Sequence, residues 1–501
     1  MLFSSMIFLW GFLPAVIIVN FMFNLLPFKS DRMRIAWKNV FLLTASFFFY
    51  AWGGIYYLLI MICSICLNFA GGYIIEKAVR TKGAKRAWLA IIVVLNLAIL
   101  FFFKYFNMLI AIIESLMMPG AGIGEIWGTM ISMKGTGALG LADIVLPIGI
   151  SFFTFQAMSY VMDVYMGKAR LQENIFDFAL YVSLFPQLIA GPIVQYADVD
   201  LQLRYRKETL DMFVSGIKRF SYGLGKKVLI SNVVAEIADG VWSLHAQEEL
   251  GAFAAWVGII AYTLQIYYDF SGYSDMAIGL GRMLGFDFKE NFDYPYTSLS
   301  IAEFWRRWHI SLGSWFREYI YIPLGGNRHG VFRTCLNVFV VYCVTGIWHG
   351  ANFTFIAWGL FYAVLQIIER LFLGKLLKKN PYKIINWIYT MGAVMLGWIY
   401  FRSDTIFQAN DYVRQLFNFT YFNNKIFQYL SITAILVVFF GILFSGFVQR
   451  PCKKLLAEIH SVKGLSYPVL VMDYALQFVI IILSIGSLVG GTYNAFIYFQ
   501  F

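Results

Sequence analysis

The residues best suited to proton transfer in this chain are its five histidines, which are His245, His309, His329, His349 and His460. His245 and His460 lie in polar sequence, where we expect solvated side chains. His329 follows a Gly-Gly-Asn-Arg segment whose composition is typical of a turn. His349 differs from these three because strongly apolar sequence surrounds it.

His349 lies in the segment TGIWHGAN, between the apolar runs 331–347 and 352–373. An ionisable residue at membrane depth is costly and by default marks a functional site. Irregular backbone at that depth survives only where it is buried in protein or lines a water-filled cavity. A neutral imidazole can take the proton of a hydroxyl that attacks a thioester, because its reference pKa is about 6.5. The alternative is a structural histidine that caps a helix end through a hydrogen bond, and position alone leaves both interpretations open.

Other catalytic patterns are absent from the sequence. It contains neither a G-x-S-x-G nucleophile elbow nor a Cys/His zinc pattern, so we expect no covalent serine and no metal. Cys63 and Cys66 spell C-x-x-C inside an apolar segment, where we expect small buried hydrophobic side chains. Asp269 and Gln187 also lie in apolar sequence. They could line a passage, or they could form hydrogen bonds that satisfy broken helices.

The elements that must position these residues are membrane helices. Of 501 residues, 60% are hydrophobic and 13% are charged, whereas a soluble domain has about 45–50% and about 25%. We therefore expect an all-α polytopic membrane protein with about eleven transmembrane helices, plus interfacial or re-entrant helices. The candidate spans lie near 2–27, 38–52, 55–75, 87–117, 144–166, 176–195, 211–240, 252–284, 331–347, 352–373, 384–401, 426–447 and 467–490. The Gly- and Met-rich segment 119–140 is expected to form an exposed loop.

The net charge of +11 reports membrane topology rather than nucleic-acid binding, because the basic residues cluster between apolar spans. Five such clusters lie near residues 29–38, 77–86, 204–227, 370–383 and 450–463. The positive-inside rule places all five in the cytoplasm, so both termini should face outside. No soluble domain or repeat is visible. We expect one domain over 1–501, with a core at about 144–370 and peripheral helices at 1–117 and 384–499.

The segment 301–321 has an amphipathic rather than a uniformly apolar pattern. At 100° per residue one face collects apolar side chains, namely Ile301, Phe304, Trp305, Trp308, Leu312, Trp315, Phe316 and Tyr319. Charged and hydroxyl side chains, Arg306 among them, fall on the opposite face, and His309 lies at the border. This pattern predicts a helix at the membrane interface or around an internal cavity.

Five sequence blocks resemble the membrane-bound O-acyltransferase (MBOAT) family, and most closely the alginate-type members of its bacterial branch. The blocks are PIGISFFTFQAMSYVMDVY (147–165), LFPQLIAGPIVQY (184–196), QIYYDFSGYSDMAIGLGRMLGF (265–286), NFDYPYTSLSIAEFWRRWHISLGSWFREYIYIPLGGNR (291–328) and GIWHGANFTFIAWG (346–359). Together they cover about half of the chain, and block 291–328 is highly specific.

The resemblance implies a fold and a site. The fold would be a ring of tilted helices around a thin core, with a cytoplasmic funnel for a thioester donor and an extracellular funnel for the acceptor. The family's near-invariant histidine falls on His349, the implied general base. A second motif position falls on His309, which would orient substrate or shape the tunnel. The substrate path is expected to involve Trp305, Arg306, Trp308, Trp348, Asn352, Asp269 and Gln187.

The alginate-type members imply a particular reaction in the bacterial inner (plasma) membrane. Acetyl would pass from cytosolic acetyl-CoA towards an extracytoplasmic serine-hydrolase-like partner and a polysaccharide acceptor. A related type instead transfers D-alanyl or another acyl group from an acyl carrier protein to teichoic acid or another cell-wall polymer. The extended region after Asp404 favours the alginate type by its length. A transporter without acyltransferase activity is a third hypothesis, but the inverted pairs of broken helices that it would need are not visible.

Overall fold

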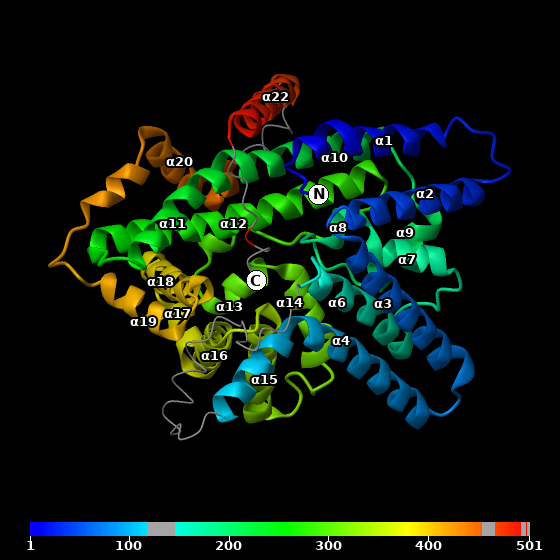
Figure 1. Ribbon diagram of the computed structural model, residues 1–501, viewed down its shortest axis with the longest axis horizontal. Helices are drawn as coiled ribbons and strands as arrows, with labels where there is room; N and C mark the ends of the chain where they lie inside the picture. The colour runs from blue at the N-terminus through cyan, green and yellow to red at the C-terminus, as the bar shows by residue number, and fades with distance from the viewer. Residues whose placement is uncertain (118–145, 453–465, 492–496, 498–501) are drawn as a thin grey trace. The chain divides into compact units, whose positions relative to one another are not determined.

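The computed structural model describes residues 1–117, 146–452, 466–491 and 497. The protein is 79% helical, and the described residues contain no β-strand (Figure 1). The expected all-α polytopic architecture is therefore confirmed. The predicted exposed loop at 119–140 lies outside the described residues.

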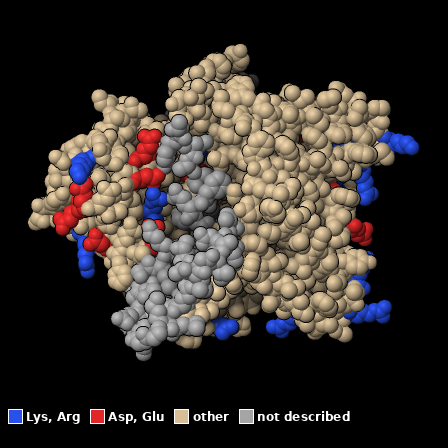
Figure 2. Space-filling view, viewed as in Figure 1, with Lys and Arg blue, Asp and Glu red and all other residues tan. Residues whose placement is uncertain are grey.

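Seven helical segments among the described residues are long and apolar enough to cross a membrane. They are Ile55–Ala78, Lys82–Ile110, Gly251–Met283, Gly330–His349, Phe353–Lys379, Lys383–Arg402 and Tyr467–Gly490. Two shorter apolar segments are Phe8–Met22 and Ile432–Phe447. Few Lys, Arg, Asp or Glu side chains interrupt the described part of the face in Figure 2, as expected for a protein that contacts lipid. The number of crossings, about eleven, and the outward position of both termini stay predictions.

The chain divides into two compact units, and the first comprises Met1–Phe103, Val145–Leu224 and Gly272–Glu290. Its helices are η1 (Phe8–Phe12), α1 (Leu13–Met22), α2 (Asp31–Ala51), α3 (Ile55–Tyr73), η2 (Ile74–Ala78), α6 (Ile150–Met166), α7 (Ile175–Ser183), α8 (Phe185–Leu188), α9 (Tyr196–Tyr205) and nearly all of α10 (Leu210–Gly225). Candidate span 176–195 is broken between α7 and α8. Long helices α4 (Lys82–Met117) and α12 (Gly251–Met283) contain residues of both units.

The second unit comprises Lys104–Ile144, Gly225–Ser271 and Asn291–Phe501. Its helices are η3 (Lys226–Ser231), α11 (Asn232–His245), η4 (Pro295–Thr297), α13 (Ile301–Arg307), α14 (Ile310–Phe316), η5 (Arg317–Tyr321), α15 (Gly330–His349), α16 (Phe353–Ile368), η6 (Glu369–Leu373), α17 (Gly374–Lys379), α18 (Lys383–Arg402), α19 (Ile406–Gln415), η7 (Asn424–Tyr429), α20 (Ile432–Ile442), η8 (Leu443–Phe447) and α22 (Ser466–Gly490). All the histidines considered for chemistry belong to this unit. The expected single domain with its core at about 144–370 stays a prediction.

Helices α15, which ends at His349, and α16 form a tightly packed antiparallel pair joined by a short connection (Figure 1). Glycine allows the two backbones to approach each other. A Cβ atom added at Gly346 would lie 2.5 Å from the carbonyl oxygen of Phe355 and 3.3 Å from the Cα atom of Gly359. Small residues at a helix crossing are a common packing device in membranes. The pair therefore holds the end of α15 in a fixed place.

The predicted amphipathic segment 301–321 is not one continuous helix, and this corrects the sequence-based expectation. Helix α13 ends at Arg307 and α14 begins at Ile310, so Trp308 and His309 form a break. His309 has a left-handed backbone, with φ of 47°. The neighbouring segment pairs with the opened backbone, because the Ile310 N–H donates to the Asn291 carbonyl over 2.9 Å. The predicted apolar face nevertheless holds, since seven of its eight side chains are buried and Trp305 is partly buried.

Candidate active site

His349 is the last residue of α15, and two side chains of α4 bind the end of that helix. The Lys104 ammonium donates to the carbonyl oxygens of Trp348 and His349, the second over 2.9 Å. The Tyr105 hydroxyl donates to the Ile347 carbonyl. The last carbonyls of a helix have no partner within it, so these contacts satisfy groups that membrane burial would otherwise make costly. They also fix the backbone from which the His349 side chain projects.

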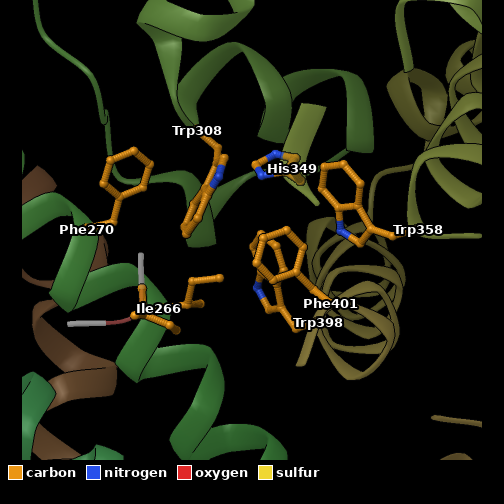
Figure 3. A pocket seen from close by; sticks show the side chains of 8 residues that line it. Ile266, Phe270, Trp308, His349, Trp358, Trp398 and Phe401 are labelled. Atoms are coloured by element: carbon orange, nitrogen blue, oxygen red, sulfur yellow. The ribbon is translucent and has the colours of Figure 1, made fainter. Parts of the chain in front are cut away.

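The His349 ring lines a small cavity whose walls are aromatic and aliphatic (Figure 3). The other lining residues are Ile266, Phe270, Trp308, Trp358, Trp398, Phe401 and Ile497. In the view of Figure 3 the imidazole lies between Trp308 and Trp358. Its ring centroid is 5.0 Å from that of Trp358 and 5.0 Å from that of Phe401. The cavity is small, with room for about one water-sized group.

The imidazole nitrogens of His349 make no hydrogen bond within the described part of the chain. The residue itself is buried, with 8% of its surface exposed. Buried polar groups are normally hydrogen-bonded, so a buried imidazole facing a cavity needs an explanation. The alternative from the sequence, a histidine whose side chain caps a helix end, is not what the structure has: side chains of α4 bind the carbonyls at that end instead. The His349 ring is therefore available to a molecule in the cavity.

His309 is held next to this cavity by the segment that precedes α13. Its Nδ1 atom lies 3.2 Å from the Oδ1 atom of Asn291, which also accepts from the Ser311 N–H and hydroxyl. An amide oxygen only accepts, so this contact requires a proton on Nδ1. Burial lowers the pKa of His309 to about 3, which keeps the ring neutral near pH 7. The lone pair of a neutral ring in this tautomer is on Nε2.

The aromatic ring of Trp348 contacts the rings of both His309 and His349. Its centroid is 6.3 Å from that of His309 and 4.9 Å from that of His349. On its other side His309 packs edge-on against Phe270, a cavity wall residue, with centroids 4.7 Å apart. His309 is thus one aromatic layer away from the cavity that His349 lines.

Helix α13 is anchored at its start by two acidic side chains. The Ser300 hydroxyl accepts from the Glu303 N–H over 3.1 Å, while the Glu303 carboxylate accepts from the Leu299 N–H over 2.9 Å. The carboxylate of Glu369, on η6, accepts from the Ile301 and Ala302 N–H groups over 2.7 and 2.9 Å. Negative charge at a helix N-terminus is favourable. These contacts fix the helix that leads to Trp308 and His309.

The other residues predicted for the substrate path have different positions. Trp308 lines the cavity, and Trp305 packs against Trp358 with centroids 5.4 Å apart. Arg306 is exposed. Asn352 caps α16 by accepting from the Thr354 N–H over 3.1 Å. Neither Arg306 nor Asn352 belongs to the cavity lining among the described residues, and their role in binding stays a prediction.

The two polar residues noted within apolar sequence lie in different units. Asp269 is buried on α12 and forms an ion pair with Lys227, with 2.6 Å between the Oδ1 and Nζ atoms. Gln187 is buried in the first unit, where its side-chain amide donates to the Tyr181 carbonyl. Both contacts agree with the alternative in which such residues satisfy polar groups inside a helical protein.

The remaining histidines and the two cysteines of the C-x-x-C pattern were not expected to take part in chemistry. The expectations for His245 and for the cysteines are wrong. The His245 side chain is not solvated: it is 4% exposed, and its Nε2 atom lies 2.9 Å from the Asp411 carboxylate. Cys63 and Cys66 are free but exposed on α3, because they fall on a face of that apolar helix that the protein does not cover. His329 lies in a turn, as expected. His460 lies outside the described residues.

Several residues at the site were missed by reasoning from the sequence. Lys104 carried a usable signal, because it is a lone cation within the apolar run AILFFFKYFNMLI. Trp358 lies within block 346–359 but has the pattern of an ordinary buried aromatic residue. Trp398, Phe401 and Ile497 carried no signal, because apolar residues are everywhere in this chain and only the fold selects those that meet at the cavity.

Comparison with known proteins defines the class. A sequence profile of the MBOAT, membrane-bound O-acyltransferase family, matches residues 172–402, which include His309, His349 and most of the cavity wall. The chain belongs to this family, and is therefore a multi-pass membrane O-acyltransferase.

Individual relatives extend the similarity beyond the matched region. A probable alginate O-acetylase AlgI of Pseudomonas putida is 39% identical in an alignment of 517 positions, gaps included, that covers 100% of both chains. A peptidoglycan O-acetyltransferase of Helicobacter pylori is 33% identical over 82% of this chain and 78% of its own. A teichoic acid D-alanyltransferase of Bacillus subtilis is 28% identical over 46% of this chain and 60% of its own.

Proposed function

We propose that the protein moves acetyl groups from cytosolic acetyl-CoA across the inner membrane for O-acetylation of an extracytoplasmic polysaccharide, with His349 as general base. One observation carries the assignment of the base. A buried imidazole at the end of a membrane helix faces a cavity and has no hydrogen-bond partner within the described residues. Intramembrane ionisable groups that face cavities are functional by default.

The proposed reaction is a direct acyl transfer. An acceptor hydroxyl oxygen attacks the thioester carbonyl carbon while His349 takes the hydroxyl proton, so that the new C–O bond forms. The tetrahedral intermediate then collapses, the C–S bond breaks, and the imidazolium returns the proton to the departing thiolate. The products are an ester and a free thiol. A positioned base of this kind typically contributes about 10²–10⁴-fold to the rate.

His309 has a positioning role in this proposal. Its neutral ring, held by Asn291, packs against Phe270 and Trp348, both of which border the His349 site. It therefore shapes the wall beside the base without taking the reacting proton. The acceptor hydroxyl belongs either to the polymer itself or to a serine-hydrolase-like partner that passes the acetyl group on.

Two observations favour acetyl over D-alanyl or other acyl groups. Relatives named as O-acetylases or O-acetyltransferases align over most or all of this chain, whereas the D-alanyltransferase aligns over less than half. The cavity beside His349 has apolar walls and little space, which suits a methyl group better than a charged aminoacyl group. Transfer from an acyl carrier protein remains the second candidate.

The base is tested by replacing His349 with Ala in cells that make the acceptor polymer. We expect alkali-labile acetyl on the polymer to fall by about 10²-fold or more, since a general base is removed. The matched control is His329→Ala, because His329 is exposed in a turn. Cells with this variant should acetylate the polymer normally. Wild-type acetylation by His349→Ala, at equal protein level in the membrane, would remove His349 from this role.

The donor is tested separately with purified protein in detergent. Radiolabelled acetyl-CoA and a D-alanyl-loaded carrier protein are offered in parallel, and label transfer to an acceptor hydroxyl is measured. We expect transfer from acetyl-CoA alone. Transfer from the carrier protein alone would replace the acetyl proposal by the D-alanyl one while leaving the role of His349 intact.

A further inference from the structure

We propose that Ile497 is a specificity-determining residue that limits the acyl group to acetyl, and that Asp269 is the positioning residue that holds it at the site. This inference rests on the proposed function. Ile497 lies far in sequence from both histidines and outside the region that the family profile matches, whereas Asp269 lies inside that region.

The Ile497 side chain forms part of the cavity wall beside His349. It is 1% exposed and lines the same small space as Ile266 and Phe270 of α12. The other lining residues belong to α15, α16 and α18 or to the break between α13 and α14. Ile497 therefore adds a side chain to a wall that is otherwise built by the helices around the base.

A buried carboxylate fixes the backbone of this residue. The Ile497 N–H donates to the Oδ2 atom of Asp269 over 2.7 Å. The Oδ1 atom of the same carboxylate lies 2.6 Å from the Lys227 ammonium, and the two side chains are 1% and 3% exposed. Asp269 lies on α12 beside Phe270 and less than one turn beyond Ile266. One turn of α12 thus supplies both a piece of the cavity wall and the anchor for Ile497.

The energetic cost of this arrangement argues for a specific purpose. Taking two charges out of water is costly, and an apolar pair of similar volume is often equally stable or more so. Buried ion pairs are best attested as devices that fix one arrangement of chain segments. Here the ion-paired carboxylate binds the backbone N–H of Ile497, whose side chain is part of the cavity wall.

The size of the cavity limits which acyl group can fit beside His349. The space accepts about one water-sized group, which is close to the size of a methyl group. With the acetyl methyl group in this space, we expect each further methylene to press against the wall, and overpacking a well-packed site is costly. Because the other lining residues belong to helices or to the break between α13 and α14, truncation of the Ile497 side chain is the simplest way to enlarge the space.

The test is a competition between donors of increasing length. Inverted membrane vesicles that carry the full chain and its acceptor polymer receive an equimolar mixture of labelled acetyl-, propionyl- and butyryl-CoA. For Ile497→Ala we expect the propionyl-to-acetyl ratio on the polymer to rise about tenfold or more, the discrimination that one methylene typically gives. Ile497→Val should produce a smaller rise.

A buried isoleucine elsewhere in the same unit provides the matched control. Ile426 on η7 is 0% exposed but does not line the cavity, so Ile426→Ala should lower stability without changing the ratio. A ratio within about twofold of wild type for Ile497→Ala would overturn the proposal, since it would show less than one methylene of discrimination.

The anchor is tested with two double variants, because removing one partner of a buried pair leaves an unpaired charge. Lys227→Met/Asp269→Asn removes both charges but keeps an acceptor for the Ile497 N–H. Lys227→Met/Asp269→Leu removes the acceptor as well. We expect the first to retain acetyl selectivity and the second to lose it, at similar thermal stability. Equal selectivity in both would contradict the role of Asp269.

The same assay separates failure of this inference from failure of the proposed function. If wild-type vesicles transfer acetyl and the Ile497 and Asp269 variants keep its selectivity, only the inference fails. If wild-type vesicles transfer no acyl group from any CoA donor, the proposed function fails and the inference with it.

Discussion

His349, the proposed base, faces a cavity while Lys104 of another helix binds its backbone. Lys104 binds the carbonyl oxygens of Trp348 and His349 from another helix, so the imidazole projects from a fixed backbone. A lysine ammonium at membrane depth is expensive, and here it meets backbone carbonyls, with the Trp348 ring 5.7 Å away. We interpret it as a positioning residue for the base.

Replacing Lys104 with Met should lower turnover on the order of 10²-fold, because small misplacements of a catalytic group have effects of that size. The Michaelis constant for the donor should change little. Lys104→Arg, which retains charge and donors, should restore part of the turnover. The control is Lys82→Met at the exposed start of the same helix. A parallel loss in both Met variants would show that the effect is not specific to the site.

His309 predicts a pH dependence of stability. Its folded pKa of about 3 lies below the unfolded value of about 6.5, so the unfolded state binds more protons between these limits. The free energy of unfolding should therefore fall as the pH is lowered from about 6.5 towards 3. Thermal unfolding in detergent at pH 7.5, 6 and 5 measures this. His309→Gln should show a weaker dependence, and an identical slope in both proteins would contradict the assignment.

At the scale of elements, the site depends on helix ends and breaks rather than on helix interiors. His349 ends α15, and His309 lies in the gap between α13 and α14. The apolar spacing in 301–321 predicted the buried face correctly, because burial follows side-chain periodicity. It could not predict the break, because the hydrogen bonds that stabilise it come from Asn291 and its neighbours, and pairing between segments leaves no periodic signal.

Packing of α15 against α16 gives a prediction about glycine. Gly346→Ala should destabilise the protein by about 1–3 kcal/mol and reduce acyl transfer, because its methyl group would overlap the Phe355 carbonyl. Gly392→Ala on α18 should be tolerated, since among the described residues no heavy atom beyond the neighbouring backbone of its own helix lies within 4 Å of the added Cβ. Melting temperatures and transfer rates of both variants provide the comparison. A tolerated Gly346→Ala would mean that the two helices can separate without affecting His349.

At the scale of the whole molecule, composition alone predicted the class of fold correctly. A chain with 60% hydrophobic and 13% charged residues has to satisfy its backbone internally, and helices do so within one segment. Because apolar residues are so common in this chain, much of the cavity lining could not be predicted from the sequence. His349 and Trp308 could be selected from motifs, whereas Trp398, Phe401 and Ile497 resemble dozens of other apolar residues. The cavity exists only because the fold brings them together.

The sidedness of the membrane protein is a further prediction at this scale. The five basic clusters place both termini outside the cytoplasm. Alkaline phosphatase fused to the C-terminus should therefore be active, and a cysteine added at the N-terminus should react with a membrane-impermeant maleimide in intact cells. Inactive fusions and protected cysteines would reverse the topology and with it the direction of acyl transfer.

The most direct test of the central claim is vectorial transfer by purified protein in proteoliposomes. Labelled acetyl-CoA is supplied on the cytoplasmic face and an acceptor hydroxyl on the other face. The wild type should form acetyl ester on the acceptor side. The variant His349→Gln, which keeps a side chain of similar size, should form at least about 10²-fold less ester. Equal ester formation by the two proteins would contradict the claim that His349 is the base.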